Sequence, residues 1–365
     1  MSKALEKPLR WGILAPGGIA KCFVGDLLLP EDADVRANHK VVAVGSRTMA
    51  KAEVFVKEVF EGREGLQRDI KCYGDYASLL SDDQVDIVYV ASPQSHHFGQ
   101  AKACLVAGKH VLCEKPLTIN AAQTEELVKI AREKKLFFME ARWTKFFPLL
   151  QEVRTLVHDK KILGDLVRVN SDFGEAFPHD HRLYDAALGG GCLLDLGIYS
   201  LTWISALLWD SPENKRAAPR ISSSLLMDKT GTVDETTTAI LQFDKIKATA
   251  VLSASLRVDL HRPGYHTIIQ GTKGDLTIHG KHTSKPLAYT LHLKDQPPKR
   301  VEPKILGWGM RYEADECALR IAEGAVESPT MDHAESVFAM QVLDTIRKQN
   351  NFSFSAEIES LDSGL

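Results

Sequence analysis

The sequence predicts an α/β protein in which a doubly wound parallel sheet is followed by an α+β domain with a large, mostly antiparallel open sheet. Three observations predict this fold. Up to about residue 147, short β-rich runs alternate with longer amphipathic stretches; from 221 to about 292, runs of Thr, Val, Ile and Leu are interrupted by turn residues; and 365 residues suffice for two domains. We place these domains at 8–147 and 148–350.

The first domain is predicted from strands that alternate with helices. In each helix, apolar residues recur at three- and four-residue spacing, which is typical of a helix packed on a sheet. The strands are expected at 11–14, 40–44, 87–91, 110–113 and 137–139, and the helices at 19–29, 49–60, 96–107 and 121–134. Ligands bind beyond the carboxyl ends of such strands, so the turns that follow them are the candidate site. The long connection at 28–38 receives no role.

The second domain is predicted to begin with a helix at 149–157 and a strand at 166–173. An irregular segment rich in His, Asp and Pro then leads to three glycines at 189–191 and a further helix. The expected antiparallel strands are separated by turn signals at 229–231, 262–264 and 273–274. Two helices, at 311–323 and 333–349, close the chain and are expected to pack back across the domain boundary near Pro148.

Composition and charge exclude several classes of protein. Lys and Arg number 45 against 48 Asp and Glu, and a formal charge of −3 argues against a nucleic-acid partner. The six cysteines are scattered without a C-x-x-C pair, which predicts neither a disulfide framework nor a metal site. No apolar leader occupies the first ten residues, and no uninterrupted apolar run reaches about 18 residues. We expect a soluble cytoplasmic protein without a membrane partner.

A glycine-rich turn follows the first predicted strand. It matches the pattern G-x-G-x-x-G/A with alanine at the first glycine position. Small residues let the backbone turn tightly and approach a pyrophosphate, to which the following helix offers its free N–H groups. The alternative is an ordinary glycine-rich turn. Dinucleotide contacts are predicted at Ala15, Gly17, Gly18, Ile19 and Ala20.

The second predicted strand ends in Ser46, Arg47 and Thr48, and no acidic residue lies in this turn. NAD sites usually place Asp or Glu here for the ribose 2′-hydroxyl, whereas NADP sites offer an arginine to the 2′-phosphate. Arg47 can pair with that phosphate and stack on the adenine, while the two hydroxyls donate hydrogen bonds. The turn therefore favours NADP(H) over NAD; the alternative is a solvated arginine at a helix start.

Two later turns carry further polar residues: A-S-P-Q-S-H-H at 91–97 and C-E-K-P at 113–116. A lysine is unusual where the core of a sheet ends, and Lys115 there can hold a substrate hydroxyl; the alternative is a surface lysine. Pro116 is compatible with a fixed turn, including one with a cis bond. For the adjacent histidines a structural role competes with a ligand contact. Cofactor contacts are predicted at Ser92, Pro93, His97, Glu114 and Lys115.

Asp195 and Tyr199 follow the three glycines at a spacing of four residues, which places both on one face of a helix. A carboxylate and a phenol presented together suit proton transfer to or from an alcohol oxygen, and a nearby cation stabilises the phenolate. The alternative is a structural pair in which Asp195 bonds the backbone and Tyr199 packs in the core.

Taken in order, these motifs resemble the glucose–fructose oxidoreductase, inositol dehydrogenase and MocA family (Gfo/Idh/MocA). The resemblance covers nearly all of the chain and extends to E-A at 140–141, D-E-T at 234–236, G-T-K-G at 271–274 and Y-E-A-D-E at 312–316. The sequence is most similar to the branch that contains NADP-dependent D-xylose dehydrogenases and dimeric trans-dihydrodiol dehydrogenases. An N-terminal Rossmann domain and a C-terminal α+β domain are implied.

The resemblance implies a catalytic centre of Lys115, Asp195 and Tyr199. Tyr199 would be the acid/base that exchanges the hydroxyl proton, Lys115 would orient that hydroxyl and stabilise the tyrosinate, and Asp195 would position the substrate. The implied reaction transfers a hydride between the nicotinamide of NADP(H) and a hydroxyl of a sugar or cyclic diol. Substrate contacts are expected from Arg142, Trp143, Arg182, Asp195 and Tyr199. An exposed face of the second sheet predicts a homodimer.

Several positions depart from the family pattern. Ala15 replaces a common glycine, Gln94 stands where Asn is usual, R-W-T-K at 142–145 replaces a more typical segment, and Trp308 stands where His is frequent. Because 142, 143 and 308 are expected near the pocket, the substrate stays open. The alternatives are a pathway-specific ketone or imine reductase of the same family, and a regulatory protein that senses NADPH without turnover. The complete set of Lys115, Asp195 and Tyr199 favours an enzyme.

Overall fold

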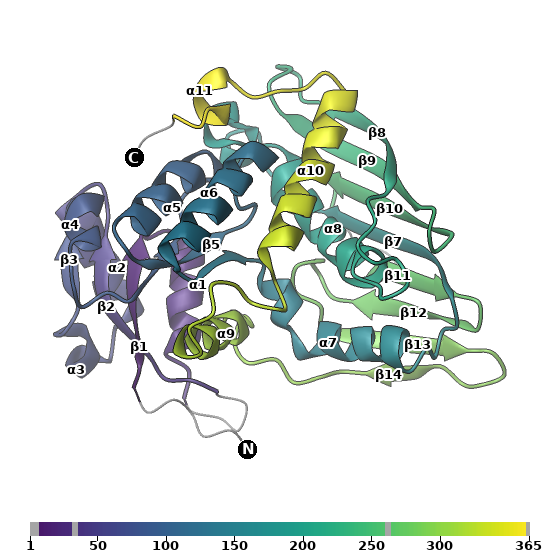
Figure 1. Ribbon diagram of the computed structural model, residues 1–365, viewed down its shortest axis with the longest axis horizontal. Coiled ribbons are helices and arrows are strands. Elements are labelled where there is room, and N and C mark those ends of the chain that lie inside the picture. The colour runs from purple at the N-terminus through teal and green to yellow at the C-terminus, as the bar shows by residue number, and fades with distance from the viewer. Residues whose placement is uncertain (1–6, 31–35, 260–263, 363–365) are drawn as a thin grey trace.

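The protein contains two sheets that stand side by side, with helices between and around them (Figure 1). The computed structural model describes residues 7–30, 36–259 and 264–362. Most of the expected turn at 262–264 and the middle of the 28–38 connection lie outside the described residues. One parallel sheet and one mostly antiparallel sheet confirm the predicted fold class.

The first sheet, sheet A, has the strand order β3-β2-β1-β4-β5-β6, and all of its neighbouring strands are parallel. The order reverses beside β1, which is where doubly wound sheets bind their ligands. The strands are β1 (Leu9–Leu14), β2 (His39–Gly45), β3 (Lys71–Tyr73), β4 (Ile87–Val90), β5 (His110–Glu114) and β6 (Phe138–Ala141). The sequence pattern missed β3, because its three residues are half-buried or exposed and form no apolar run.

Helices cover both faces of sheet A. On one face Phe23 and Phe55 enter an apolar cluster with Trp11, and on the other Phe98 and Leu127 enter a second cluster. Full burial of such side chains contributes about 1.5–3 kcal/mol each, which is why the amphipathic pattern located these helices. They are α1 (Gly18–Leu27), α2 (Met49–Val59), α3 (Glu64–Gln67), α4 (Tyr76–Leu80), α5 (His97–Val106) and α6 (Ala121–Lys134).

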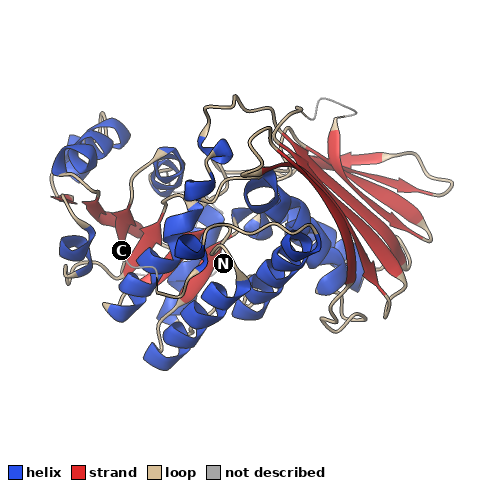
Figure 2. Cartoon of the chain, turned by 90° about the horizontal axis from the view of Figure 1, so that it is seen from above, coloured by secondary structure: helices blue, strands red, loops and turns tan. Residues whose placement is uncertain are grey.

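The second sheet, sheet B, has the strand order β14-β13-β12-β11-β7-β10-β9-β8. Only the pair β7 and β10 is parallel among its described neighbours. The strands are β7 (Leu166–Gly174), β8 (Arg220–Met227), β9 (Asp234–Phe243), β10 (Ala248–Ser255), β11 (Tyr265–Gly271), β12 (Gly274–His279), β13 (Ala288–Leu293) and β14 (Lys299–Val301). Figure 2 shows sheet B as a curved layer with helices on one side and a bare face on the other.

The segment Ala186–Trp209 packs against β7 and β10 of sheet B. It is long and apolar enough to span a membrane, yet its most apolar stretch is fully buried inside the molecule, as in a core helix. It contains the π-helical turn η6 (Leu193–Gly197), α8 (Ile198–Ile204) and the π-helical turn η7 (Ser205–Trp209). Single π-helical turns inside longer helices are frequent at functional sites.

The C-terminal part of the chain returns to sheet A, as predicted. The helices α9 (Arg311–Ala322) and α10 (His333–Gln349) pack against α1 and α6 respectively. Asp26 of α1 accepts hydrogen bonds from the backbone N–H of Trp308 (2.9 Å) and Met310 (2.8 Å), and the N–H of Phe138 in β6 donates to the carbonyl of Val326 (3.0 Å). The crossover between the sheets runs through η2 (Trp143–Phe146) and α7 (Pro148–Arg154).

Candidate active site

The glycine-rich turn between β1 and α1 has an open cradle at the helix N-terminus. Gly17 is the N-cap of α1 and has no side chain to bond the first N–H groups, and a Cβ added at Gly18 would meet nothing within 4 Å. Ala15 has φ +60°, the left-handed region that favours glycine, and this explains the glycine usual at its position. Ile19 is exposed beside the cradle, whereas Ala20 is buried under α1. These residues fit a dinucleotide pyrophosphate.

The turn after β2 presents a free cation. Arg47 is exposed and forms no ion pair with any residue that the structure describes, whereas Ser46 is buried and its N–H donates to the carbonyl of Tyr73. Thr48 is exposed as the N-cap of α2. Burial lowers the pKa of His96, and the charge of Arg47 lowers this pKa further, so the two side chains lie near each other. A free arginine here fits a 2′-phosphate.

Lys115 and Asp195 form a largely buried ion pair between β5 and η6. The Nζ of Lys115 donates to the carbonyl oxygen of Asp195 (2.9 Å) and to its Oδ1 (3.1 Å). The same Oδ1 accepts from Gln94 Nε2 (3.2 Å) and from Arg182 (3.3 Å). Burial raises the pKa of Asp195, but the charges of Lys115 and Arg182 outweigh this effect and hold the pKa below its usual value. Asp195 is therefore a carboxylate at neutral pH.

Tyr199 lies beside this pair, one helical turn beyond Asp195. The Nζ of Lys115 is 4.7 Å from the centre of the Tyr199 ring, and the indole Nε1 of Trp143 donates to the Tyr199 oxygen at 2.6 Å. Burial raises the pKa of Tyr199 well above 10, and the charge of Glu114 adds to this effect. Tyr199 is therefore a phenol at neutral pH, in contact with a cation that favours its anion.

The helix that carries Asp195 and Tyr199 is anchored on sheet B. Asp234 in β9 accepts hydrogen bonds from the N–H of Leu193 (2.8 Å) and the thiol of Cys192 (3.0 Å). Gly191 has φ +112°, and a Cβ there would come within 2.2 Å of an Asp234 oxygen. The predicted glycine run thus has a physical reason, because only glycine permits this approach.

The two turns that carry Ser92 and Lys115 are joined by His97. Its Nδ1 lies 2.8 Å from the carbonyl of Pro116 and its Nε2 lies 2.9 Å from the carbonyl of Ser92. Burial lowers the pKa of His97 to about 4. The described contacts are those of a structural histidine, the alternative that the sequence left open. The Ser92 hydroxyl, by contrast, is buried and has no hydrogen-bond partner in the described structure, which fits a ligand contact.

Glu114 and Pro116 complete the turn around Lys115. The Glu114 carboxylate accepts a short hydrogen bond from Tyr89 and another from the N–H of Lys115 (3.2 Å), and burial raises its pKa. The Lys115–Pro116 peptide bond is cis. Glu114 is thus bound to protein groups, while Pro93 is half-buried at the start of the neighbouring turn.

The three further residues expected at the substrate are placed differently from one another. Arg182 is 44% exposed and bonds Gln94 (3.1 Å) as well as Asp195. Trp143 contacts Tyr199. Arg142, however, is fully buried and pairs with Glu140 (2.7 Å) and Glu335 (3.6 Å). The charge of Arg142 is thus paired inside the protein, and its expected contact with a substrate stays a prediction.

Gln94 is bonded to two of the predicted site residues, although its position in the sequence indicated only a departure from the family pattern. It is buried, accepts from Arg182 through Oε1 and donates to Asp195 through Nε2. An amide can accept a hydrogen bond from a cation through its oxygen and donate one to a carboxylate through its nitrogen. This property of Gln94 is the sequence signal that could have indicated its place beside Asp195 and Arg182.

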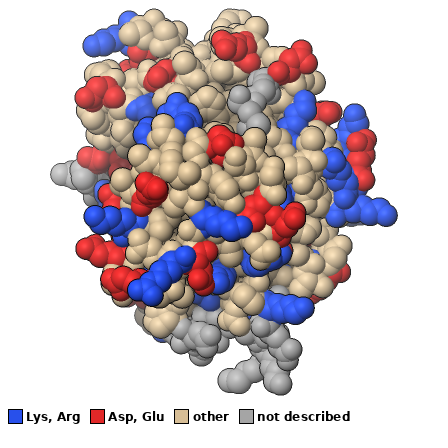
Figure 3. Space-filling model, turned by 90° about the vertical axis from the view of Figure 1, so that its left-hand side faces the viewer, with Lys and Arg blue, Asp and Glu red and all other residues tan. Residues whose placement is uncertain are grey.

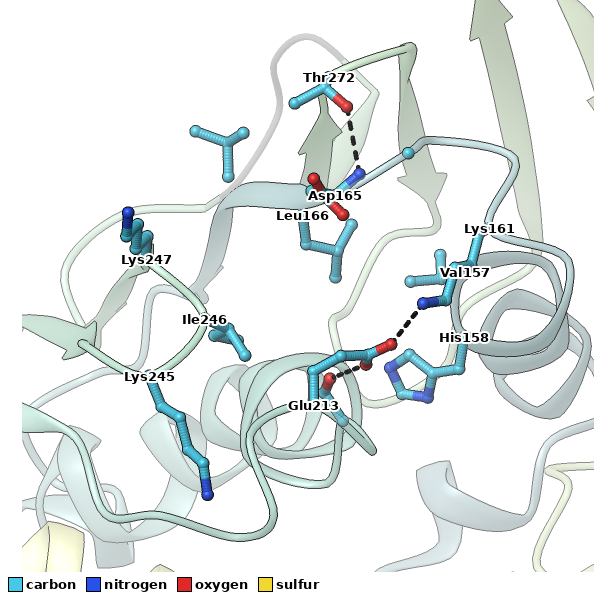
Figure 4. A pocket seen from close by; sticks show the side chains of 13 residues that line it. Val157, His158, Lys161, Asp165, Leu166, Glu213, Lys245, Ile246, Lys247 and Thr272 are labelled. Carbon is cyan, nitrogen blue, oxygen red and sulfur yellow. Dashed lines mark hydrogen bonds and ion pairs between the residues drawn. The ribbon is translucent and has the colours of Figure 1, made fainter.

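A cavity of about 430 Å³ lies elsewhere, beside the start of β7 (Figure 4). It is lined by Lys161, Lys247 and Thr272, among others, and Lys161 forms an ion pair with Glu213. None of the predicted site residues lines it. Figure 3 shows basic and acidic side chains interspersed over the face on the side of sheet A, as the near-neutral composition predicts.

The chain is similar to known proteins along most of its length. A family model described as an oxidoreductase family with an NAD-binding Rossmann fold (Gfo/Idh/MocA) matches residues 9–141, and the model of a C-terminal domain of this family matches residues 150–277. The chain is 38% identical to a D-xylose 1-dehydrogenase (NADP(+)) of Hypocrea jecorina, over 95% of this chain and 93% of that protein. It is 35% identical to a trans-1,2-dihydrobenzene-1,2-diol dehydrogenase of Bos taurus, over 95% and 98% of the two chains.

Solved structures share the fold. An aldose–aldose oxidoreductase from Caulobacter crescentus, complexed with glycerol, has a TM-score of 0.79 at 23% identity and covers 94% of this chain and 98% of its own. A 3-ketoreductase from Actinomadura kijaniata, in complex with NADP and TDP-benzene, has a TM-score of 0.76 at 22% identity with the same coverage.

Proposed function

The chain belongs to the Gfo/Idh/MocA oxidoreductase family, and from this premise we propose that it transfers a hydride between NADP(H) and a hydroxyl of a sugar or cyclic diol, with Tyr199 as the acid/base. The observation that carries this proposal is the convergence of Lys115, Asp195 and Tyr199 at the carboxyl edge of sheet A. A single ammonium group contacts both the carboxylate and the phenol ring.

The bound nicotinamide would supply or accept the hydride, and the residues of this chain would hold and move the proton. Tyr199 exchanges the proton of the reacting hydroxyl. Lys115 stabilises the tyrosinate that forms when Tyr199 gives up its proton to a carbonyl oxygen. Lys115 therefore acts on the charge that develops during the reaction.

Asp195 is proposed to bind a substrate hydroxyl. Three donors converge on its Oδ1, namely Lys115, Gln94 and Arg182, while its Oδ2 accepts no hydrogen bond from any described residue. A carboxylate oxygen without a partner at an ion pair is a strong acceptor for a hydroxyl group. Arg182, which is partly exposed beside it, would add a donor to a neighbouring substrate oxygen.

The cofactor contacts are proposed for the cradle at Gly17 and Gly18, for Arg47 with its neighbouring hydroxyls, and for the Ser92 turn. The support is structural: an open helix N-terminus, an arginine without an ion pair, and a buried hydroxyl without a partner, each statement holding for the described residues. NADP is also named with the similar enzyme of Hypocrea jecorina.

We further propose a cytoplasmic homodimer formed through the bare face of sheet B. One row across this face reads Ile240, Val251, Asn170 and Ile268, which are successive partners in the strand register. Ile240 is 50% exposed and Leu226 is 60% exposed on the same face, and an exposed apolar stripe on a sheet marks an interaction surface. All six cysteines are free, which fits a reducing compartment.

The test of the catalytic proposal is nicotinamide absorbance with NADP⁺ and a panel of aldoses and cyclic diols, on the wild type and on Tyr199→Phe. We expect kcat to fall by about 10²–10⁴-fold in the variant, the usual worth of general acid–base catalysis. Tyr289→Phe is the matched control, because Tyr289 is also buried and its hydroxyl bonds Glu152 (2.8 Å) instead of the site. Unchanged turnover in Tyr199→Phe would overturn the assignment, and cofactor binding without any turnover would favour a sensor.

A further inference from the structure

The hydrogen bond between Trp143 and Tyr199 determines where the Tyr199 proton can point. A phenol has one hydrogen to donate and two lone pairs that accept. The Trp143 indole carries only a donor, so it occupies a lone pair of the Tyr199 oxygen at 2.6 Å. Within the described structure, the Tyr199 hydroxyl donates to no residue. Its proton therefore remains available to a group that is not part of the protein.

The indole is held rigidly by the segment around it. Arg142 and Lys145, which flank it, are fully buried and form ion pairs with Glu335. The hydroxyl of Thr144 donates to the carbonyl of Ser284 (2.6 Å), and the Trp143 ring packs edge-on against Phe147 with centroids 5.6 Å apart. A donor fixed in this way need not reorganise when charge develops on its partner, which is the property that makes such donors effective.

The charged groups around Tyr199 mostly oppose its ionisation. The carboxylates of Glu114 on β5, Asp195 on η6 and Glu313 on α9 all raise its pKa, and only Lys115 and Trp143 among the described contacts favour the anion. Tyr89 on β4 bonds Glu114 and does not contact the Tyr199 oxygen in the described hydrogen bonds. Loss of the indole donor would leave Lys115 as the remaining stabiliser of the tyrosinate.

We propose that Trp143 is a positioning residue that directs the Tyr199 proton toward the substrate oxygen and stabilises the tyrosinate left behind. In the reductive direction the Tyr199 O–H bond breaks, the proton bonds to the carbonyl oxygen, and the phenol becomes an anion held by Trp143 and Lys115; NADPH, when bound, would supply the hydride that the carbonyl carbon receives. The oxidative direction is the reverse. The inference rests on the proposed role of Tyr199.

The first experiment measures the ionisation of residue 199 without turnover. A fluorinated tyrosine, whose phenol is more acidic, is incorporated at position 199, and its titration is followed by fluorine NMR. We expect its pKa to rise by about one pH unit in Trp143→Phe. The reason is that the indole donor binds the tyrosinate more strongly than the neutral phenol, and loss of this difference in free energy corresponds to a shift of about that size. Trp203→Phe is the matched control. Trp203 is buried on α8, the helix that also carries Tyr199, but its indole donates to the carbonyl of Thr283 (3.1 Å).

The second experiment measures turnover. In the reductive direction, where Tyr199 is the acid, we expect kcat of Trp143→Phe to fall by about tenfold with little change in KM, and the alkaline limb of the kcat/KM profile to move up by about one pH unit. Benzothienylalanine at position 143 keeps the shape of tryptophan and replaces the N–H by sulfur, so it should reproduce both effects in a folded protein.

An unchanged fluorotyrosine titration in Trp143→Phe, or an equal shift in Trp203→Phe, would overturn the inference. The two proposals fail separately. If the wild type shows no NADP(H)-dependent turnover but the titration shifts as expected, the proposed function is wrong and the coupling of Trp143 to Tyr199 stands. If turnover requires Tyr199 but the titration does not respond to Trp143→Phe, the proposed function stands and the coupling of Trp143 to Tyr199 is wrong.

Discussion

Arg47 is the residue on which cofactor choice depends in our proposal, because it is exposed and the described structure gives it no ion pair. We expect Arg47→Ala to weaken NADP⁺ binding by about 10–100-fold, the loss of charge-assisted hydrogen bonds to a phosphate, and NAD⁺ binding by less than about twofold. Calorimetry with the two cofactors measures both constants. An equal loss for both would contradict a 2′-phosphate contact. Arg63→Ala, also exposed but on another loop, is the control.

Ala15 illustrates a residue whose backbone conflicts with its side chain. Its φ of +60° is strained for alanine by about 1 kcal/mol, whereas the added freedom of glycine in the unfolded chain offsets part of that strain. We expect Ala15→Gly to leave the free energy of unfolding unchanged or slightly higher. Ala20→Gly, inside α1, should lower it by about 1 kcal/mol. Denaturant unfolding compares the two, and a similar loss in both would show that Ala15 is not strained.

At the scale of elements, the start of the helix that carries Asp195 depends on Gly191. A methyl group there would approach an Asp234 oxygen to 2.2 Å at a backbone angle of +112°. We expect Gly191→Ala to lower the free energy of unfolding by about 2–3 kcal/mol and to reduce kcat, because Asp234 would release the N–H of Leu193. Gly62→Ala is the control, since it also has a positive φ but open space around it. Equal losses in the two variants would assign the effect to the backbone angle alone.

The two turns of the site are coupled through His97, which makes their stability sensitive to acid. The pKa of His97 is about 4 in the folded protein against 6.5 in an unfolded chain, so the unfolded state binds the proton first. Stability from this group is therefore complete above pH 6.5 and is lost, by about 3 kcal/mol in total, as the pH falls toward 4. Denaturant unfolding at several pH values in this range measures the slope of the free energy of unfolding against pH. This slope should be smaller for His97→Asn than for the wild type, whereas His179→Asn, at the surface, should keep the wild-type slope. A wild-type slope in His97→Asn would contradict this reading.

At the scale of the whole molecule, the bare face of sheet B is the proposed contact between two copies. We expect Ile240→Glu to convert the dimer to a monomer, because the charge would be buried opposite its own copy in a two-fold contact. Sedimentation velocity measures the mass. Val54→Glu is the control, since Val54 is 54% exposed on α2, a helix that packs on sheet A. A wild-type monomer, or a dimer that survives Ile240→Glu, would place the contact elsewhere or exclude it.

Much of the fold follows from local sequence, and much of the site does not. The alternation of strands and amphipathic helices predicted sheet A because each helix has its own apolar stripe, whereas β3 was missed because it has none. The parallel pairing of β7 with β10 joins strands far apart in the chain, and no local pattern encodes it. The burial of Arg142 and Lys145 likewise depends on Glu335, which is 190 positions from Lys145. Residue types located Lys115, Asp195 and Tyr199, but only the folded chain shows that Trp143 bonds Tyr199.

The hydrogen bonds between Asp26 and the loop before α9 limit how this protein can be divided into separate domains. Asp26, on the helix that follows the glycine-rich turn, accepts hydrogen bonds from residues 308 and 310, which lie more than 280 positions further along the chain, and Phe138 of β6 donates to the carbonyl of Val326. The N-terminal region and the C-terminal helices, which are separate in sequence, are thus joined by hydrogen bonds in the folded protein. A fragment cut after residue 147 would lose the partners of Asp26 and Phe138. We expect the nucleotide-binding half to be inherited, exchanged or engineered only together with the C-terminal helices.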